Sequence, residues 1–477
     1  MTYEVVIGLE VHVELLTESK LFCSCPNRFV PEPNVNTCPV CLGFPGALPQ
    51  MNMHAVQKAL TASLALNCDI ALHSYFDRKN YFYPDMPKGY QISQYFEPIG
   101  RKGFLTVEDD QGRPKIVRIG RVHMEEDAGK LVHAPGGNTS MVDYNRAGVP
   151  LIEIVTEPDL RSPGESRRYL EQLKRILQYA RVSDCKMEEG SLRCDANISL
   201  RPAGREAFGS KTELKNMNSF KAVEKSLEHE IKRQGIILHR GDEVISQTLR
   251  WEESKQETIV MRGKLEAHDY RCFTDPELAP IELTSGEIEE ARAALPEMAE
   301  ARAARFKDDY GLPGYDAEVL TGSRCLADYF EACLAYYNNP KAVSNWVMGE
   351  LTAQLNIADL EVDQCSFQPE DMSDLLKMID ENLISGKIAK DVLEKSFKSG
   401  KPPRKIVEEE GLLQISEQSE LEGIIEKVIG DNPDSIEKYR SGKTKVIGFL
   451  VGQVMKETKG KANPQLVNEL LVKKINS

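Results

Sequence analysis

An alternating segment at the start of the chain, Tyr3 to Leu15, constrains the fold more than any other. Hydrophobic residues fill its odd positions, whereas Glu10, His12 and Glu14 occupy even positions. This period of two predicts a half-buried strand. The three polar side chains then project from one face, about 7 Å apart at the usual rise per residue. Two carboxylates beside an imidazole suit a divalent cation, although the solvated face of an edge strand would have the same pattern.

Composition narrows the class of protein. The chain has 477 residues, 41% of them hydrophobic, which is enough for roughly two to four domains. Its formal net charge of −14 argues against a protein that coats nucleic acid or lies on a membrane surface. Without an apolar run of about 18 residues or a signal segment, we expect no membrane contact and a cytoplasmic location, or an organelle if a targeting peptide has been removed. Eleven cysteines then indicate free or metal-bound thiols.

The secondary structure that the sequence pattern predicts changes near residue 290. Before it, short alternating strands mix with helices, and after it the pattern is helical throughout. A segment rich in Pro and Gly, 399–403, divides the helical part. We therefore predict an α+β fold with a catalytic domain at 1–290, a helical linker domain at 291–403 and a helical tail domain at 404–477.

Four cysteines form two close pairs. Cys23, Cys25, Cys38 and Cys41 have the spacing C-x-C-x12-C-x2-C, and five prolines between residues 26 and 45 deny this segment regular structure. Two thiol pairs at this separation suit tetrahedral zinc held by four thiolates, and the metal would supply the order that the backbone lacks. We predict a structural zinc knuckle at 23–41, with free or redox-active thiols as the alternative.

Two further stretches place acids on the polar faces of strands. Glu125 ends a predicted strand, 116–125, and completes a site with Glu10 and His12 if that strand pairs with the first one. A predicted hairpin, 192–201 with 211–217, brings Asp195 near Glu213 and Lys215. Acids that bind Mg²⁺ beside cations that bind phosphate are typical of phosphoryl transfer. Structural cross-strand ion pairs are the alternative for each cluster.

Two other features concern phosphate binding. The stretch 204–212 resembles a P-loop but has Ser210 where the pattern requires Lys, and it lies between two strands, so we interpret it as a hairpin turn. The last forty residues contain nine Lys or Arg against two Glu. Such a basic end on an acidic protein indicates a contact with RNA phosphates, although an ordinary solvated helical face is the alternative. The lysines that we assign to it are Lys443, Lys445, Lys456 and Lys459.

The order of these motifs resembles that of the B subunit of the bacterial and organellar glutamyl-/aspartyl-tRNA amidotransferase. The similar strings in the first domain lie at 7–15, 76–85, 90–94, 123–130, 190–197 and 213–216. The strings 448–456 and 462–468 resemble the small helical tRNA-binding domain of this family. The archaeal E subunit shares the catalytic core but carries an inserted domain, for which 477 residues leave little room.

The resemblance implies a cradle-shaped catalytic domain built on an antiparallel sheet, followed by two all-helical domains. It also implies work in a heterotrimer, in which an amidase A subunit releases ammonia from glutamine and a small C subunit clamps the pair. The B subunit would use ATP to phosphorylate the side-chain carboxylate of Glu mischarged on tRNA-Gln, or of Asp on tRNA-Asn. Ammonia would then displace phosphate to give the amide.

The resemblance also assigns roles to residues. Glu10, His12 and Glu125 match metal-binding positions of the family, for Mg²⁺ or, because His is an unusual Mg²⁺ ligand, Mn²⁺. We add Asp195 and Glu213 to the catalytic set. Lys79, Arg193 and Lys215 are candidates for binding ATP phosphates on charge alone. The four cysteines match a zinc site that only some family members keep.

One stretch departs from the family. Where the family commonly has Asp-Tyr-Arg-Tyr-Phe-Pro-Glu-Pro-Asp-Leu, this chain reads Asp-Tyr-Arg-Cys-Phe-Thr-Asp-Pro-Glu-Leu at 269–278. Acidic character survives at Asp275 and Glu277, so we expect a change of shape rather than a loss of activity. The competing interpretation of the whole chain is a non-catalytic tRNA-binding scaffold, which would need no acidic metal cluster.

Overall fold

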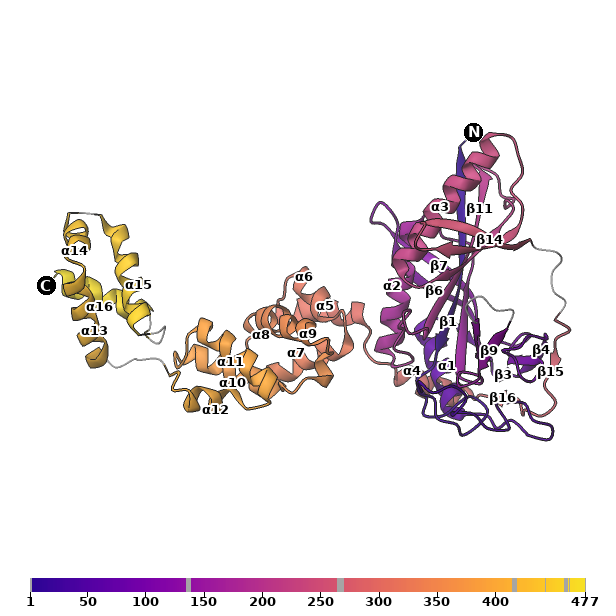
Figure 1. Cartoon of the computed structure of the whole chain (residues 1–477), viewed down its shortest axis with the longest axis horizontal. Coiled ribbons are helices and arrows are strands. Elements are labelled where there is room, and N and C mark those ends of the chain that lie inside the picture. Colours follow the sequence, from indigo (N-terminus) through magenta and orange to yellow (C-terminus); the bar gives the residue numbers. More distant parts are fainter. Residues whose placement is uncertain are drawn as a thin grey trace. The chain divides into compact units, whose positions relative to one another are not determined.

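The computed structural model describes residues 2–133, 139–263, 270–413, 418–441, 443–458, 462 and 464–476. The chain divides into two compact units, Met1–Met298 and Ala299–Ser477 (Figure 1). Two positions singled out in the sequence, Asp269 and Lys459, lie outside the described residues. Within the described part of the chain, no helix combines the length and apolar character needed to cross a membrane.

The first unit is organised by one large sheet of twelve described strands. Their order is β14-β13-β12-β11-β1-β10-β7-β5-β4-β15, with β6 paired to β7 and β2 paired to β6. The strands are β1 (Tyr3–Glu14), β2 (Asp69–Ile70), β4 (Asp77–Asn80), β5 (Tyr90–Ser93), β6 (Gly100–Glu108), β7 (Pro114–Glu126), β10 (Pro150–Thr156), β11 (Leu192–Pro202), β12 (Thr212–Met217), β13 (Gln247–Glu252), β14 (Glu257–Gly263) and β15 (Phe273–Thr274). All their pairings are antiparallel except that of β12 with β13, which α3 connects.

Smaller elements complete the unit. Two strand pairs lie outside the large sheet, β3 (His73–Ser74) with β16 (Ile281–Glu282) and β8 (Lys130–His133) with β9 (Ser140–Asp143). The helices are α1 (Met53–Ala65), α2 (Pro163–Tyr179), α3 (Phe220–His239) and α4 (Ser285–Ala293). Serine side chains cap α2 and α3: Ser162 accepts from the Glu165 amide and Ser219 from the Ala222 amide, which satisfies donors that have no partner within the helix.

The first strand lies at the centre of the sheet rather than at its edge. β11 pairs with it on one side and β10 on the other, and β10 then pairs with β7. The sequence suggested that β1 pairs directly with the strand carrying Glu125. That expectation is wrong, because the apolar strand β10 lies between them. The predicted hairpin of β11 and β12 is confirmed.

The two faces of β1 have different environments. The odd residues Ile7, Leu9, Val11 and Val13 are fully buried, in a core to which α1, α2 and α3 contribute. In Figure 1, α2 and α3 lie along the sheet. Removing apolar surface from water is the main stabilising term for this layer. The even residues, including His12, are therefore left on the opposite face of the sheet.

The second unit is helical. Its helices are α5 (Ala299–Tyr310), α6 (Gly314–Leu320), α7 (Arg324–Tyr336), α8 (Pro340–Trp346), α9 (Thr352–Ala358), α10 (Pro369–Asp380), α11 (Gly386–Ser399), α12 (Pro403–Glu409), α13 (Gln418–Asp431), α14 (Pro433–Arg440), α15 (Ile447–Glu457) and α16 (Pro464–Asn476). A π-helical turn, Val347–Leu351, joins α8 to α9, and 3-10 turns occur at Val362–Gln364 and Thr444–Val446.

Two separate hydrophobic clusters fill this unit. One includes residues from Ala303 to Val407, and the other includes residues from Leu421 to Ile475. Helix α12, which the sequence-based division assigns to the tail, contributes Ile406 and Val407 to the first cluster. The predicted fold class, an α+β unit with a largely antiparallel sheet followed by helices alone, is confirmed.

Candidate active site

Four ionisable side chains meet on the polar face of three neighbouring strands. His12 Nε2 on β1 lies 3.3 Å from Glu125 Oε1 on β7 and 3.9 Å from Glu153 Oε2 on β10. His123 Nε2, also on β7, lies 3.0 Å from Glu153 Oε2 and 3.6 Å from Glu125 Oε2. The alternation of the strands explains this, because His12, Glu153 and His123 occupy directly opposed register positions.

Burial and charge act against each other in this cluster. Burial lowers the pKa of His12, but the hydrogen bond and charge of Glu125 and the charge of Glu153 outweigh it and raise the pKa to about 9. The pKa of His123 is raised by the same two carboxylates against its burial. Burial raises the pKa of Glu125, yet the two imidazoles hold it well below its usual range. The carboxylates are thus kept ionised in a buried place by imidazoles that carry protons, and a cation bound there would displace the proton of His12.

This cluster fits a divalent cation. One ligand atom from each of His12, Glu125 and Glu153 lies near the others: His12 Nε2 is 3.3 Å from Glu125 Oε1 and 3.9 Å from Glu153 Oε2, within the separation of about 4.2 Å between opposite ligands held at about 2.1 Å from one cation. The Nδ1 atom of the buried His123 has no hydrogen-bond partner among the described residues. Carboxylate oxygens are the preferred ligands of Mg²⁺, and an added imidazole also suits Mn²⁺.

A second acidic group lies beside the first. Lys215 Nζ on β12 lies 2.5 Å from Asp195 Oδ2 on β11 and 3.3 Å from Glu213 Oε1. Burial raises the pKa of Glu10, as do the charges of Glu153, Asp195 and Glu213, while Asn197 donates a hydrogen bond to Glu10 Oε1 at 2.8 Å. Glu10 therefore lies between the two groups, and it does not share the three-ligand cluster with His12 and Glu125.

The candidate phosphate-binding cations differ in their surroundings. Arg193 lies opposite His12 in the register and pairs with Asp127 at 2.7 Å, so it borders the cluster. Lys79 on β4 instead lies 4.9 Å from the centroid of the Tyr270 ring. Within the described residues, Lys79 forms no ion pair with the two acidic groups.

The divergent stretch has a structural role. Arg78 Nε lies 2.7 Å from the buried Asp275 Oδ2, and Arg78 Nη2 lies 2.8 Å from Glu277 Oε2. The short strand β15 adds Phe273 and Thr274 to the edge of the sheet beside β4. The two acids at changed positions therefore hold the segment 270–277 against β4.

A pocket adjoins Glu10 on the same face. Its volume is about 310 Å³, and both apolar and polar groups line it. Its lining includes Val6, Glu10, Pro158, Asn197 and Phe208. The loop between β11 and β12, the stretch that resembles a P-loop, supplies Phe208 and Lys211. An apolar hollow with a few convergent polar groups is the usual form of a small-molecule site.

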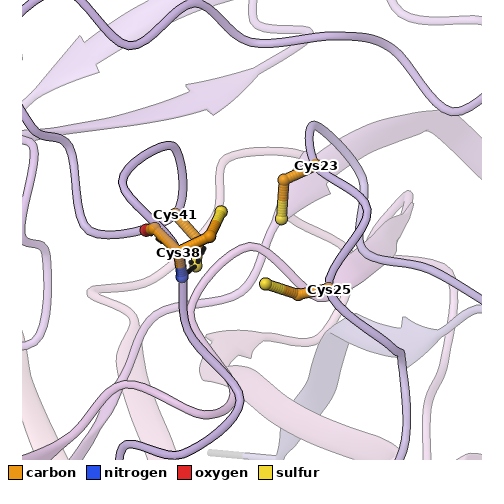
Figure 2. Close-up of side chains that lie close together, drawn as sticks. All are labelled: Cys23, Cys25, Cys38 and Cys41. Carbon is orange, nitrogen blue, oxygen red and sulfur yellow. Dashed lines mark hydrogen bonds between the residues drawn. The ribbon is translucent and has the colours of Figure 1, made fainter.

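The four cysteines of the knuckle converge as their spacing predicts. Their sulfur atoms all lie within 4.8 Å of one another, and Figure 2 shows Cys23 and Cys25 facing Cys38 and Cys41 from an opposite loop. The Cys38 and Cys41 sulfurs are 3.8 Å apart, which matches the edge of a tetrahedron with Zn–S bonds of about 2.3 Å. The Cys38 amide donates to Cys41 Sγ at 3.1 Å. The donor set therefore fits a zinc ion.

Two members of the cluster escape prediction from the sequence. Glu153 stands alone in the apolar run Leu151–Val155, and a single carboxylate inside a buried strand is the signal that would have marked it. The strand pattern places His123 on one face with Arg121 and Glu125 but does not assign it to the site. It is buried between two acids, Glu125 on its own strand and Glu153 on the neighbouring β10.

Comparisons with known proteins define the class and then the family. The model of the GatB/GatE catalytic domain matches residues 5–289, which contain the whole acidic face, and the model of the GatB domain matches residues 328–475. The chain is 57% identical over 477 residues, covering 100% of both chains, to the B subunit of the aspartyl/glutamyl-tRNA(Asn/Gln) amidotransferase of Moorella thermoacetica. It is 56% identical over 478 residues, or 99% of both chains, to that of Carboxydothermus hydrogenoformans.

The chain belongs to the family of B subunits of aspartyl/glutamyl-tRNA(Asn/Gln) amidotransferases. Full-length similarity to these proteins confirms the B type over the archaeal E type. The chain therefore functions as the B subunit of a tRNA-dependent amidotransferase, a ligase of translation.

Proposed function

We propose that this chain uses ATP to phosphorylate the side-chain carboxylate of Glu mischarged on tRNA-Gln, of Asp mischarged on tRNA-Asn, or of both. A carboxylate repels nucleophiles and has a poor leaving group, and an acyl phosphate removes both obstacles. Ammonia then attacks the acyl carbon, and the C–O bond to phosphate breaks to give the amide. The observation that carries the proposal is the group of acids and imidazoles on the polar face of β1, β10 and β7.

His12, Glu125 and Glu153 would hold a divalent cation, with Glu10 between them and the neighbouring acids. A cation there would draw charge from the phosphate oxygens of ATP. Arg193 and Lys215 would meet the same oxygens. Arg193 and Lys215 are already paired with carboxylates. These ion pairs would hold the two side chains in place before ATP binds.

The pocket beside Glu10 would take the nucleoside part of ATP. A purine base needs apolar walls and a few polar partners, and the pocket offers Val6, Pro158 and Phe208 beside Asn197. Its position next to Glu10 is consistent with phosphates that extend toward the cluster. Lys211 at the pocket rim adds a cation near this path.

The basic end of the chain would bind the tRNA backbone. Lys443, Lys445 and Lys456 are exposed, and none of them forms an ion pair within the described residues. Lys459 belongs to the same proposal by sequence alone. The chain would work in a cytoplasmic complex with an amidase A subunit that supplies ammonia and with a small C subunit, and its four-cysteine knuckle would be filled by zinc.

Reconstitution with the amidase partner, ATP and the two mischarged tRNAs tests the proposal. Glu125→Gln keeps the shape of the side chain but removes its charge, and we expect amide formation to fall by at least about 10³-fold while tRNA binding is retained. Glu171→Gln is the matched control, because Glu171 pairs with Arg167 on the exposed side of α2, a helix that packs against the apolar face of the sheet. Unchanged amidation in Glu125→Gln would favour the tRNA-binding scaffold instead.

A further inference from the structure

Lys20, just before the four-cysteine knuckle at 23–41, is a charged residue that is completely buried. Its side chain is fully buried, with 0% of its surface exposed, and it stands three residues before Cys23. Its Nζ atom lies 2.9 Å from the Asn36 carbonyl oxygen and 3.8 Å from Cys41 Sγ. The ammonium group therefore points into the cysteine cluster.

A buried ammonium group needs a compensating anion. Within the described residues, no carboxylate forms an ion pair with Lys20, although such pairs hold other buried charges, such as Asp275, in this unit. A neutral carbonyl alone does not offset the loss of hydration that a charge suffers on burial. Among the described residues, the Cys41 thiol is the acidic group that contacts the Lys20 ammonium, whereas the buried Glu126 nearby is paired with Lys88.

Four thiolates around Zn²⁺ carry a net charge of about −2. We propose that Lys20 is the counter-ion of this zinc–thiolate centre, donating an N–H···S hydrogen bond to the Cys41 thiolate and thereby raising the affinity of the knuckle for zinc. Lys20 is a positioning residue and does not ligate the metal. The assignment also explains why a lysine stands at a position with no access to water.

The backbone of Lys20 joins the two halves of the knuckle. Its amide donates to the Cys25 carbonyl at 2.9 Å, while its Nζ donates to the carbonyl of Asn36, two residues before Cys38. The side-chain stem passes close to Gly148, whose own φ is +84° and near which Cys41 also lies. One residue therefore contacts both cysteine pairs, as expected of a group that organises a metal site from outside its ligand shell.

Zinc affinity tests the proposal directly. The probe is zinc alone, titrated into full-length chain against a chromophoric chelator. Lys20→Met keeps the length and apolar stem of the side chain and removes its charge, and we expect zinc to bind about 10- to 100-fold more weakly. Lys58→Met is the matched control, since Lys58 Nζ donates to the Arg181 carbonyl at 2.5 Å without contacting a thiol, and we expect its affinity to equal that of the wild type.

Thermal unfolding with and without chelator supplies a second measurement. Removing zinc leaves Lys20 without an anion, so chelation should lower the melting temperature of the wild type more than that of Lys20→Met. If Lys20→Met does not fold, Cys41→Ser is compared with the double variant Lys20→Met/Cys41→Ser. We expect the double variant to be the more stable, because it no longer buries an uncompensated cation.

The outcomes separate this proposal from its premise. A folded Lys20→Met chain with zinc affinity within twofold of the wild type would overturn the role of Lys20 but leave the zinc site intact. A double variant less stable than Cys41→Ser would overturn it as well. A wild-type chain that binds no zinc would overturn the site and the proposal together. None of these results depends on the amidation reaction.

Discussion

The sheet unit and the helical unit treat charged side chains in different ways. In the sheet unit, the buried charged or titratable residues include Lys20, Asp77, His123, Glu125, Glu126, Asp127, Glu153, Glu165, Glu230 and Asp275. Among the described residues of the helical unit, only Arg302 and Asp316 are charged and equally buried. Ion pairs are common in both units, so the two units differ in how deeply their charged side chains are buried rather than in the number of ion pairs.

Geometry accounts for the difference. A strand sends every second side chain to the same face, and neighbouring strands bring such rows within contact distance. Residues far apart in sequence, such as His12 and Glu153, thus meet without either strand leaving the core. A helix offers one apolar stripe and turns its other residues to water. The comparison teaches that the catalytic chemistry belongs to the sheet, whereas the helical unit can use its charges at the surface, for contacts with other molecules.

A change of Glu153, which no pattern in the sequence singled out, gives the strongest test of whether the buried charges of the sheet unit serve catalysis. We expect Glu153→Gln to lower amide formation by about 10²- to 10³-fold, because it removes a carboxylate shared by His12 and His123. The free energy of unfolding should change by no more than about 2 kcal/mol. The assay is amide formation on mischarged tRNA in the reconstituted complex, beside urea unfolding. An active Glu153→Gln, with exposed Glu289→Gln as control, would mean that the buried charges are structural.

The next largest effect concerns the surface charges of the tail. Replacing Lys443, Lys445 and Lys456 by Gln should weaken tRNA binding by about 10- to 100-fold, because each removes a phosphate contact. The slope of affinity against salt concentration should fall by about one per lost contact, while the rate with saturating tRNA stays unchanged. Lys427→Gln is the control, since Lys427 already pairs with Glu457. Equal salt slopes in the variant and the wild type would remove the tail from the RNA contact.

The sequence predicted much of the fold because alternation and helical period are local signals. The strands β1, β7 and β11 and their polar faces follow from spacing alone, and so does the convergence of the cysteines. The order in which the strands pair does not follow from spacing. It depends on which strand becomes buried between two neighbours, and that is decided by contacts between distant segments. The run Leu151–Val155 is apolar apart from Glu153, so its pattern gives this acid no role, whereas the position of β10 between β1 and β7 makes Glu153 the centre of the cluster.

Two other features are not visible in the sequence either. Lys20 lies in an unremarkable stretch, and only the folded knuckle shows that it is enclosed beside Cys41. The helical period of residues 342–356 predicts one unbroken helix, but the π-helical turn Val347–Leu351 interrupts it, and Thr352 Oγ1 donates to the Val347 carbonyl there at 2.7 Å. For Lys20 the partners come from segments 16 and 21 residues away, which a local pattern does not show.

The buried Arg302 of the helical unit pairs with Glu331, and we expect the loss of this contact to have a moderate effect on stability. Burial raises the pKa of Glu331, but hydrogen bonds from Arg305, Arg302 and Tyr310 outweigh it and lower the pKa to about 2. A lowered folded-state pKa stabilises above the ordinary value near 4.5, and this contribution is lost as the pH falls toward 2. We expect Glu331→Gln to destabilise the unit by about 1–3 kcal/mol at pH 7, a range that allows for partial solvent screening. The difference from the wild type should shrink between pH 4.5 and pH 2.

Fluorescence can follow that unit alone. The chain has two tryptophans, Trp251 in the sheet unit and Trp346 in the helical unit, so a Trp251→Phe background leaves one reporter in the helices. Urea unfolding of Trp251→Phe with and without Glu331→Gln, at a series of pH values, gives the difference directly. A constant difference from pH 7 to pH 2 would show that the contact is not ionic.

The smallest expected effect comes from an ordinary surface pair of the same unit. Glu394 and Lys398 stand one turn apart on α11, and both side chains are about half exposed. Solvent screens their attraction, and holding two long side chains in one geometry costs entropy. We expect Glu394→Gln to leave the melting temperature unchanged within about 1 °C, as measured by Trp346 fluorescence in the Trp251→Phe background. A change in melting temperature as large as that of Glu331→Gln would mean that exposed charges stabilise the helices as strongly as buried ones. The two units would then differ only in the acidic cluster that the sheet carries.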